Sequence, residues 1–121
     1  MKTILAVDDS AVIRLYFEES LKETDYAILT AKDGNNALQQ IEKSENPIDA
    51  FIIDIIMAGM DGLTLIRHIR QLKNYRDTPI MVLTSLSDPS SVEEARSAGA
   101  NCWVNKPFEI EQVLSALDKL F

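Results

Sequence analysis

The chain has 121 residues, of which 46% are hydrophobic and 26% charged, which is typical of one globular domain with a sizeable core. Its formal net charge of −7 argues against direct nucleic-acid binding, because that function needs a basic surface. No apolar run approaches the roughly 20 residues of a membrane span, and the first residues lead into a short strand without a signal peptide. We therefore expect a cytoplasmic protein with no membrane partner.

Short apolar runs alternate with amphipathic runs along the chain. The apolar runs predict strands at 3–7, 27–31, 50–54, 79–84 and 102–105. Helices are predicted from the N-cap Ser10 through about residue 24, and over 35–44, 61–72, 89–98 and 109–121. Strands that alternate with helices in this way predict an α/β fold with a doubly wound parallel sheet.

The spacing of apolar residues also predicts which helix faces pack on the sheet. In the first helix the apolar positions are Val12, Ile13, Tyr16, Phe17 and Leu21, and in the third they are Leu65, Ile66, Ile69 and Leu72. His68 falls between apolar positions and is expected on a solvated face. Cys102, the only cysteine, excludes an internal disulfide and is expected to be a small buried residue.

Polar side chains stand at the ends of four predicted strands. They are Asp8 and Asp9 after the first strand, Asp54 at the end of the third, Thr84 at the end of the fourth and Lys106 after the fifth. In open α/β sheets, ligands bind beyond the carboxyl ends of the strands, so these groups are expected to share one pocket.

Three carboxylates in one pocket repel each other unless one is protonated or a cation lies among them. Mg²⁺ is the natural candidate, because it is a hard cation that takes one or two carboxylates together with phosphate oxygens and water. A carboxylate such as Asp54, held beside Mg²⁺ and the ammonium of Lys106, can attack phosphorus and form an aspartyl phosphate.

The motifs around these residues resemble those of response-regulator receiver domains, and most closely the stand-alone chemotaxis regulators of the CheY type. They are VDDS (7–10), DIIMAGMDG (54–62), LTS (83–85), SAGA (97–100) and NKPF (105–108). The resemblance covers essentially the whole chain. It implies a flavodoxin-like sheet of five strands in the order 2-1-3-4-5 with five helices, and one receiver domain over residues 1–121 with no effector domain.

The resemblance also assigns roles to single residues. It implies that Asp54 is phosphorylated, and that Asp9 and Asp54 bind Mg²⁺ directly. Asp8 would help through water, and the main-chain carbonyl of Ile56 would be a further ligand. Thr84 would move toward the phosphoryl group, and Lys106 would pair with it.

Three further features follow from the same resemblance. The peptide bond between Lys106 and Pro107 is expected to be cis. Trp103 stands at the switch-aromatic position, where the family usually has Tyr or Phe. Ala58 stands where the family commonly has Pro, and its loss frees the loop after Asp54 without removing a chemical group.

The function that the resemblance implies is two-component signalling in the branch that controls chemotaxis.

 A histidine kinase would donate the phosphoryl group, and the output would be a protein contact through the surface of the fourth helix, fifth strand and fifth helix. The flagellar motor switch is one such target. The alternative is a phosphate sink or phosphorelay intermediate. In either case the chain is expected to be a monomeric phosphoacceptor that assists its own phosphorylation and dephosphorylation, and not an enzyme.

Three rival functions fit the residues less well. A phosphatase of the haloacid-dehalogenase kind needs a second Asp two residues after its nucleophile, where this chain has Ile56. An FMN carrier of the flavodoxin type must hold a phosphate in its first loop, where Asp8 and Asp9 would repel it. A receiver-like scaffold that works unphosphorylated would not need the full set of acids, Thr84 and Lys106.

Overall fold

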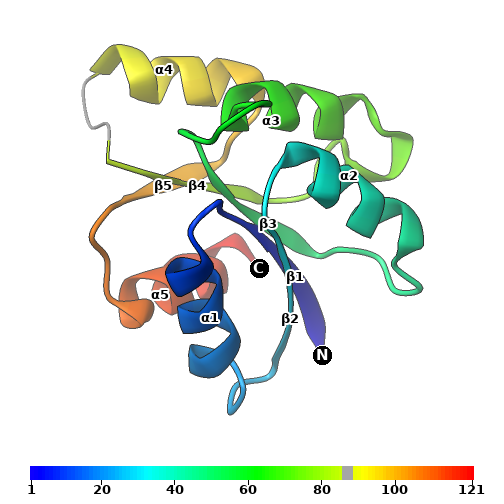
Figure 1. Ribbon diagram of the computed structural model, residues 1–121, viewed down its shortest axis with the longest axis vertical. Coiled ribbons are helices and arrows are strands. Elements are labelled where there is room, and N and C mark those ends of the chain that lie inside the picture. Colours follow the sequence, from blue (N-terminus) through cyan, green and yellow to red (C-terminus); the bar gives the residue numbers. More distant parts are fainter. Residues whose placement is uncertain (86–88) are drawn as a thin grey trace.

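The computed structural model describes residues 1–85 and 89–121, and its centre is a five-stranded parallel sheet (Figure 1). The strands are β1 (Lys2–Val7), β2 (Tyr26–Ala31), β3 (Ala50–Asp54), β4 (Ile80–Thr84) and β5 (Cys102–Asn105). The helices are α1 (Ala11–Ser20), α2 (Gly34–Lys43), α3 (Gly62–Gln71), the 3-10 turn η1 (Lys73–Tyr75), α4 (Pro89–Ala98) and α5 (Ile110–Leu120). The strand order is β2-β1-β3-β4-β5, which confirms the predicted doubly wound fold.

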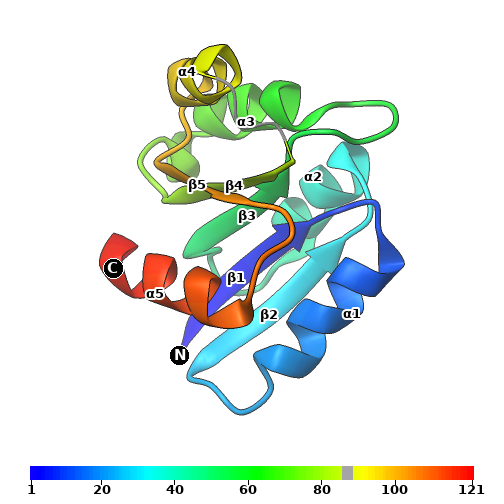
Figure 2. The ribbon, with the colours of Figure 1, turned by 90° about the vertical axis from the view of Figure 1, so that its left-hand side faces the viewer.

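The helices form two layers, one on each face of the sheet. Figures 1 and 2 show α2, α3 and α4 over one face and α1 with α5 over the other. Alternate residues of β1 serve the two cores: Leu5 and Val7 pack in the cluster under α2, α3 and α4, whereas Ile4 and Ala6 pack in the cluster under α1 and α5. The strands therefore bury both faces, which explains why they are continuous apolar runs in the sequence.

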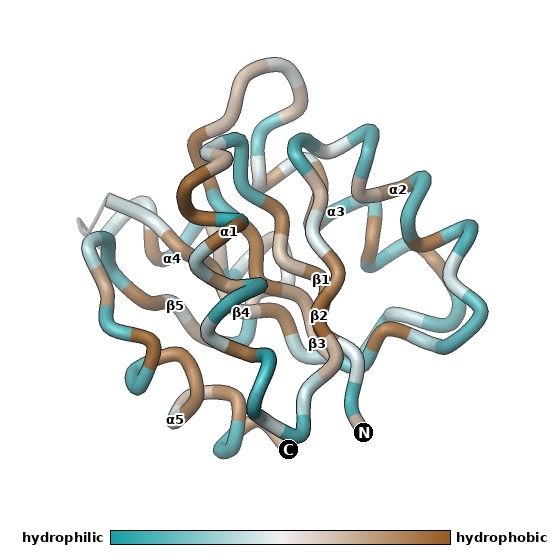
Figure 3. Tube along the Cα trace, turned by 60° about the horizontal axis from the view of Figure 1, so that its bottom comes forward, coloured by the Kyte–Doolittle hydropathy of each residue, from teal (hydrophilic) through white to brown (hydrophobic). Residues whose placement is uncertain are grey.

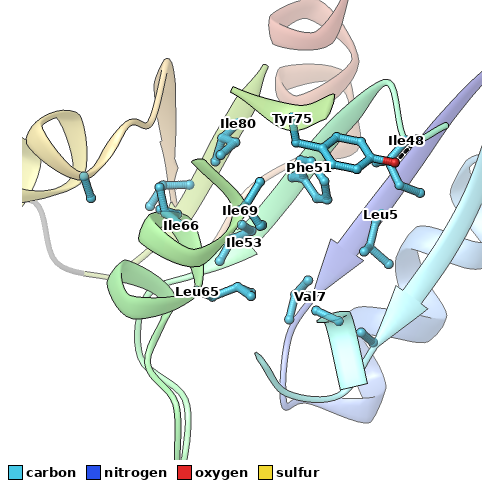
Figure 4. Packing of buried hydrophobic residues seen from close by; sticks show 14 of the residues in the cluster. Leu5, Val7, Ile48, Phe51, Ile53, Leu65, Ile66, Ile69, Tyr75 and Ile80 are labelled. Carbon is cyan, nitrogen blue, oxygen red and sulfur yellow. Dashed lines mark hydrogen bonds between the residues drawn. The ribbon is translucent and has the colours of Figure 1, made fainter. Parts of the chain in front are cut away.

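The core under α2, α3 and α4 is drawn in Figure 4. Phe51 meets the ring of Tyr75 edge-on at 5.5 Å between centroids, and the Tyr75 hydroxyl accepts a hydrogen bond from the Ile48 N–H at 3.3 Å. In Figure 3 hydrophobic positions predominate along the central strands, and hydrophilic positions recur along the outer helices. None of the described helices is both long enough and apolar enough to cross a membrane.

Side chains just before the helices explain where several of them begin. Ser10, Asp33 and Asp61 each accept a hydrogen bond from a main-chain N–H three residues later, which satisfies one of the free donors of the first turn. Gly99 ends α4 with a positive φ of 122°, a conformation that favours glycine, and donates its N–H to the Ala95 carbonyl. The predicted N-cap of α1 and the predicted C-terminal cap of α4 are thus confirmed.

The end of α1 was predicted about four residues too late. The helix ends at Ser20, because the Thr24 hydroxyl donates to the Leu21 carbonyl at 2.7 Å and accepts from the Tyr26 N–H at 3.2 Å. These bonds form a local turn that competes with the helical pattern.

The predicted inward faces also need correction at their edges. Val12 is 76% exposed, and Tyr16 lies at the rim of its core. Leu72 follows α3 as its C-cap and is exposed, since the chain turns there into η1. Cys102 is only partly buried, against the core under α1 and α5, and this burial raises the pKa of its thiol. His68 is exposed, as predicted.

Arg70 joins three segments at the far end of α3. Its guanidinium donates to the carbonyls of Gly99 at 2.7 Å, Tyr75 at 2.8 Å and Thr78 at 2.6 Å, and to the Asn101 side chain at 3.1 Å. One side chain therefore satisfies main-chain acceptors of the loops before β4 and before β5.

Arg70→Ala should lower the free energy of unfolding by about 2–3 kcal/mol, because several partly buried carbonyls lose their donor together. Urea denaturation followed by circular dichroism measures the change. Arg67→Ala, which removes an exposed arginine from the same helix, should change stability by less than about 0.5 kcal/mol. Equal losses in the two variants would contradict this role of Arg70.

Candidate functional site

Asp8 lies just after β1 and is held through all of its polar groups. It is 1% exposed. Its N–H donates to the Ala31 carbonyl at 3.1 Å, and its own carbonyl accepts from Arg14 Nη1 at 2.7 Å. Its Oδ1 accepts from the Ser10 N–H at 2.9 Å, and its Oδ2 lies 2.8 Å from Lys106 Nζ. A buried carboxylate with this many partners has one fixed orientation.

Asp54 is the last residue of β3 and is 4% exposed. Its Oδ1 accepts from the Ile56 N–H at 3.3 Å, and its Oδ2 lies 3.3 Å from Lys106 Nζ. The start of α3 comes so close that a Cβ at Gly62 would overlap the Asp54 carbonyl oxygen. Position 62 therefore has room only for glycine, a requirement that the helix predicted over 61–72 did not reveal.

Asp9 completes a cluster of three carboxylates. One carboxylate oxygen from each of Asp8, Asp9 and Asp54 lies within 4.8 Å of the other two. Asp8 and Asp54 are buried, whereas Asp9 is exposed, so the cluster opens to solvent on one side. A set of hard oxygen donors with access from water fits Mg²⁺. The main-chain carbonyl of Ile56 stays a predicted further ligand.

Lys106 reaches this cluster from the loop after β5. Its N–H donates to the Thr84 carbonyl at 2.9 Å, which ties the loop to the end of β4. The bond between Lys106 and Pro107 is cis, as predicted. The ammonium then lies between Asp8 and Asp54 and pairs with both.

Aromatic contacts with α1 support the same loop. Phe108 stacks on Phe17 at 5.5 Å and meets Tyr16 at 5.8 Å between ring centroids. The Tyr16 hydroxyl accepts from the Ile110 N–H at 3.0 Å. These contacts fix the loop relative to α1, and sequence analysis did not identify them because they join residues about 90 positions apart.

The electrostatics of the cluster leave it short of positive charge. Burial raises the pKa of Asp54, and the neighbouring Asp8 raises it further, against the opposing effect of Lys106. Burial lowers the pKa of Lys106, but the hydrogen bonds and charges of Asp8 and Asp54 outweigh it, so the pKa is raised. One ammonium therefore faces two buried carboxylates, which favours a further cation.

Thr84 and Trp103 lie beside the cluster on the α4 side. Thr84 ends β4, next to the strand that carries Asp54. Thr84 and Trp103 both border a cavity of about 30 Å³. Trp103 is 42% exposed on β5. A cavity of this size holds about one water molecule, so an indole ring cannot enter it without movement of its walls. Ala58, where the family commonly has Pro, is exposed in the loop after Asp54.

The comparisons with known proteins agree on one family. A profile described as "Response regulator receiver domain" matches residues 4–118. The structure of the chemotaxis protein CheY4 from Vibrio cholerae aligns over 100% of this chain and 99% of its own, with 35% identity and a TM-score of 0.94. The response regulator TrrA from Thermotoga maritima, in complex with Mg²⁺ and beryllofluoride, aligns over 100% of both chains, with 36% identity and a TM-score of 0.84.

Curated relatives extend beyond the matched region. The transcriptional regulatory protein YrkP from Bacillus subtilis, described as uncharacterized, is 38% identical over 110 residues, which are 91% of this chain and 45% of that protein. The chain spans about half the length of the curated relatives it matches. The similarity is therefore limited to the shared region and does not extend to the activity or partners of those longer proteins.

Lys106→Met should lower the free energy of unfolding by about 2 kcal/mol in metal-free buffer, because the buried Asp8 carboxylate loses its cation. The double variant Asp8→Asn with Lys106→Met should regain most of this loss, since a neutral amide replaces the unpaired charge. Urea denaturation at pH 7 with EDTA gives both values. If the double variant is no more stable than the single one, the pairing is not what stabilises Asp8.

Proposed function

Because the chain belongs to the family of response regulator receiver domains, we propose that it is a phosphorylation-switched signalling protein whose phosphoacceptor is Asp54. Receiver domains of two-component systems accept a phosphoryl group on an aspartate. The observation that carries the assignment is the place of Asp54: a buried carboxylate at a strand end, 3.3 Å from Lys106 Nζ and within 4.8 Å of two further acids. The Asp54 carboxylate thus lies beside the charged groups that could assist it as a nucleophile.

The proposed transfer takes place at one oxygen of Asp54. This oxygen attacks the phosphorus of a phosphohistidine on a histidine kinase, while the bond from phosphorus to the imidazole nitrogen breaks and the nitrogen keeps the electron pair. Lys106 and the hydroxyl of Thr84 would donate hydrogen bonds to the phosphoryl oxygens. Bound Mg²⁺ would neutralise charge on those oxygens. Its proposed ligands are Asp9, Asp54 and the main-chain carbonyl of Ile56, with Asp8 contributing through water.

The proposed output is a change in a protein-binding surface. Thr84 and Trp103 border the same small cavity. A movement of Thr84 toward a phosphoryl group would therefore change the shape of the cavity beside the indole ring. Trp103 belongs to the surface of α4, β5 and α5, which we propose as the contact surface for a downstream protein. The exposure of Trp103 supports this role.

We propose chemotaxis as the pathway, on the similarity to CheY4 over nearly the full length of both chains. The flagellar motor switch is then one target, and a phosphate sink or phosphorelay intermediate is the alternative. Nucleic acid is not a proposed partner, because the net charge is −7. A cytoplasmic location, a monomeric state and the absence of enzymatic turnover on phosphoesters stay predictions.

Acetyl phosphate with Mg²⁺ should label a single residue, Asp54, because this carboxylate ends β3 beside Lys106, whereas the Asp8 carboxylate is held more closely by Lys106 and by the Ser10 N–H. Reduction with borohydride followed by mass spectrometry locates the acyl phosphate. Asp54→Asn should take up no label, whereas Asp61→Asn, a change at an exposed N-cap, should be labelled like the parent. Label on another residue, or undiminished label in Asp54→Asn, contradicts the assignment.

Trp103 fluorescence should change when Mg²⁺ and beryllofluoride are added, because the only tryptophan borders the cavity that Thr84 lines. The emission maximum and intensity of the parent are compared with those of Asp54→Asn, which should show no change. An unaltered spectrum in the parent, under conditions where beryllofluoride binding is measured independently, would mean that the ring does not take part in the switch.

A further inference from the structure

We propose that Arg14 is a positioning residue for the acidic cluster: it holds the peptide group between Asp8 and Asp9 and so sets where the Asp9 carboxylate lies for a divalent cation. The inference rests on the proposed function of the site. It concerns a residue of α1 that lies outside the set of acids, hydroxyl and ammonium described above.

The contact is between Arg14 Nη1 and the main-chain oxygen of Asp8, at 2.7 Å. That oxygen belongs to the planar peptide group that joins Asp8 to Asp9. A charge-assisted hydrogen bond to it restricts rotation of the whole plane, and therefore the direction in which the Asp9 side chain leaves the main chain.

Arg14 also contacts the main chain on the other side of Asp9. Its N–H donates to the Ser10 carbonyl at 3.1 Å, as the first turn of α1 requires. Arg14 thus bonds to the carbonyls of Asp8 and Ser10, the residues on either side of Asp9, the first through its side chain and the second through its main chain. Arg14 therefore holds the main chain on both sides of Asp9.

Asp9 needs this support more than Asp8 does. The Asp8 carboxylate is already oriented by Ser10 and Lys106. The Asp9 carboxylate is exposed, and within the described residues it makes no hydrogen bond or ion pair. Its position in the cluster is therefore set through its backbone, where Arg14 bonds.

The charge of Arg14 alone would have the opposite effect. A guanidinium beside a site for a divalent cation repels that cation, so removal of the charge by itself should tighten Mg²⁺ binding. If Arg14 acts by orientation, its removal should weaken binding instead, as loss of a group that orients a metal ligand does. The two explanations predict opposite signs, and the orienting one is the proposal.

The test is a titration of the ¹⁵N-labelled protein with Mg²⁺, followed by NMR through the amide signals of the cluster. Arg14→Met keeps the apolar stem and removes the charge and donors, and it should weaken Mg²⁺ binding by about tenfold. Arg14→Lys keeps one donor and should regain part of the affinity. Arg67→Met, a matched change on the exposed face of α3, should bind like the parent. Relaxation measurements on metal-free protein should show a more mobile Asp9 amide in Arg14→Met.

Several results would overturn the proposal. Tighter binding of Mg²⁺ by Arg14→Met would show that Arg14 acts through its charge, and equal binding would show that it does not orient a ligand of the site. An Asp9 amide as rigid as in the parent would show that the effect does not pass through Asp9. If Arg14→Met does not fold by circular dichroism, Arg14→Gln is judged by the same criteria. A parent protein that binds no Mg²⁺ overturns the metal site of the proposed function as well, whereas a parent that binds and an Arg14→Met that binds equally overturn this inference alone.

Discussion

The ion pair that Lys106 makes with two buried carboxylates is the interaction on which the site depends. Its Nζ lies 2.8 Å from Asp8 and 3.3 Å from Asp54, and it comes from the far end of the chain. Burying charges in this way is costly unless they are paired, so the fold must bring the ends of β1, β3 and β5 to one edge with little freedom. The pairing is incomplete, because one ammonium faces two carboxylates with Asp9 nearby. This residual negative charge is what makes the site receptive to a cation and, through it, to a phosphoryl group.

The surroundings of the cluster divide into a rigid side and an open side. On the rigid side, Gly62 brings α3 against the carbonyl of Asp54, and Phe108 packs on α1 to fix the loop that carries Lys106. On the open side, Asp9 is exposed and Trp103 borders a cavity that is smaller than its ring. Asp54 and Lys106 thus lie against packed elements, whereas Asp9 and Trp103 lie where fewer groups pack on them.

The receiver region is shared by proteins that are named for different functions. Proteins named for chemotaxis and for transcriptional regulation share this receiver region with the chain, and the latter are about twice as long. The same receiver region therefore occurs in proteins named for different roles, because function depends on sites and surfaces and not on the fold alone. The surface of α4, β5 and α5 is the proposed place where a partner contacts this chain.

The order of elements, the parallel sheet and the strand-end groups could all be predicted from local patterns, because apolar runs and helical spacing are local and parallel strands share one carboxyl edge. The bounds of β3, α4 and β5 agree with those predicted, whereas α1 ends early because Thr24 forms a turn that periodicity does not report. Three contacts became visible only in the folded chain: Arg14 bonds to the carbonyl of Asp8, Gly62 lets α3 start against the carbonyl of Asp54, and Phe108 stacks on Phe17. Such contacts depend on distances between elements, and those distances are set by how the helices pack on the sheet and not by any pattern within a single segment.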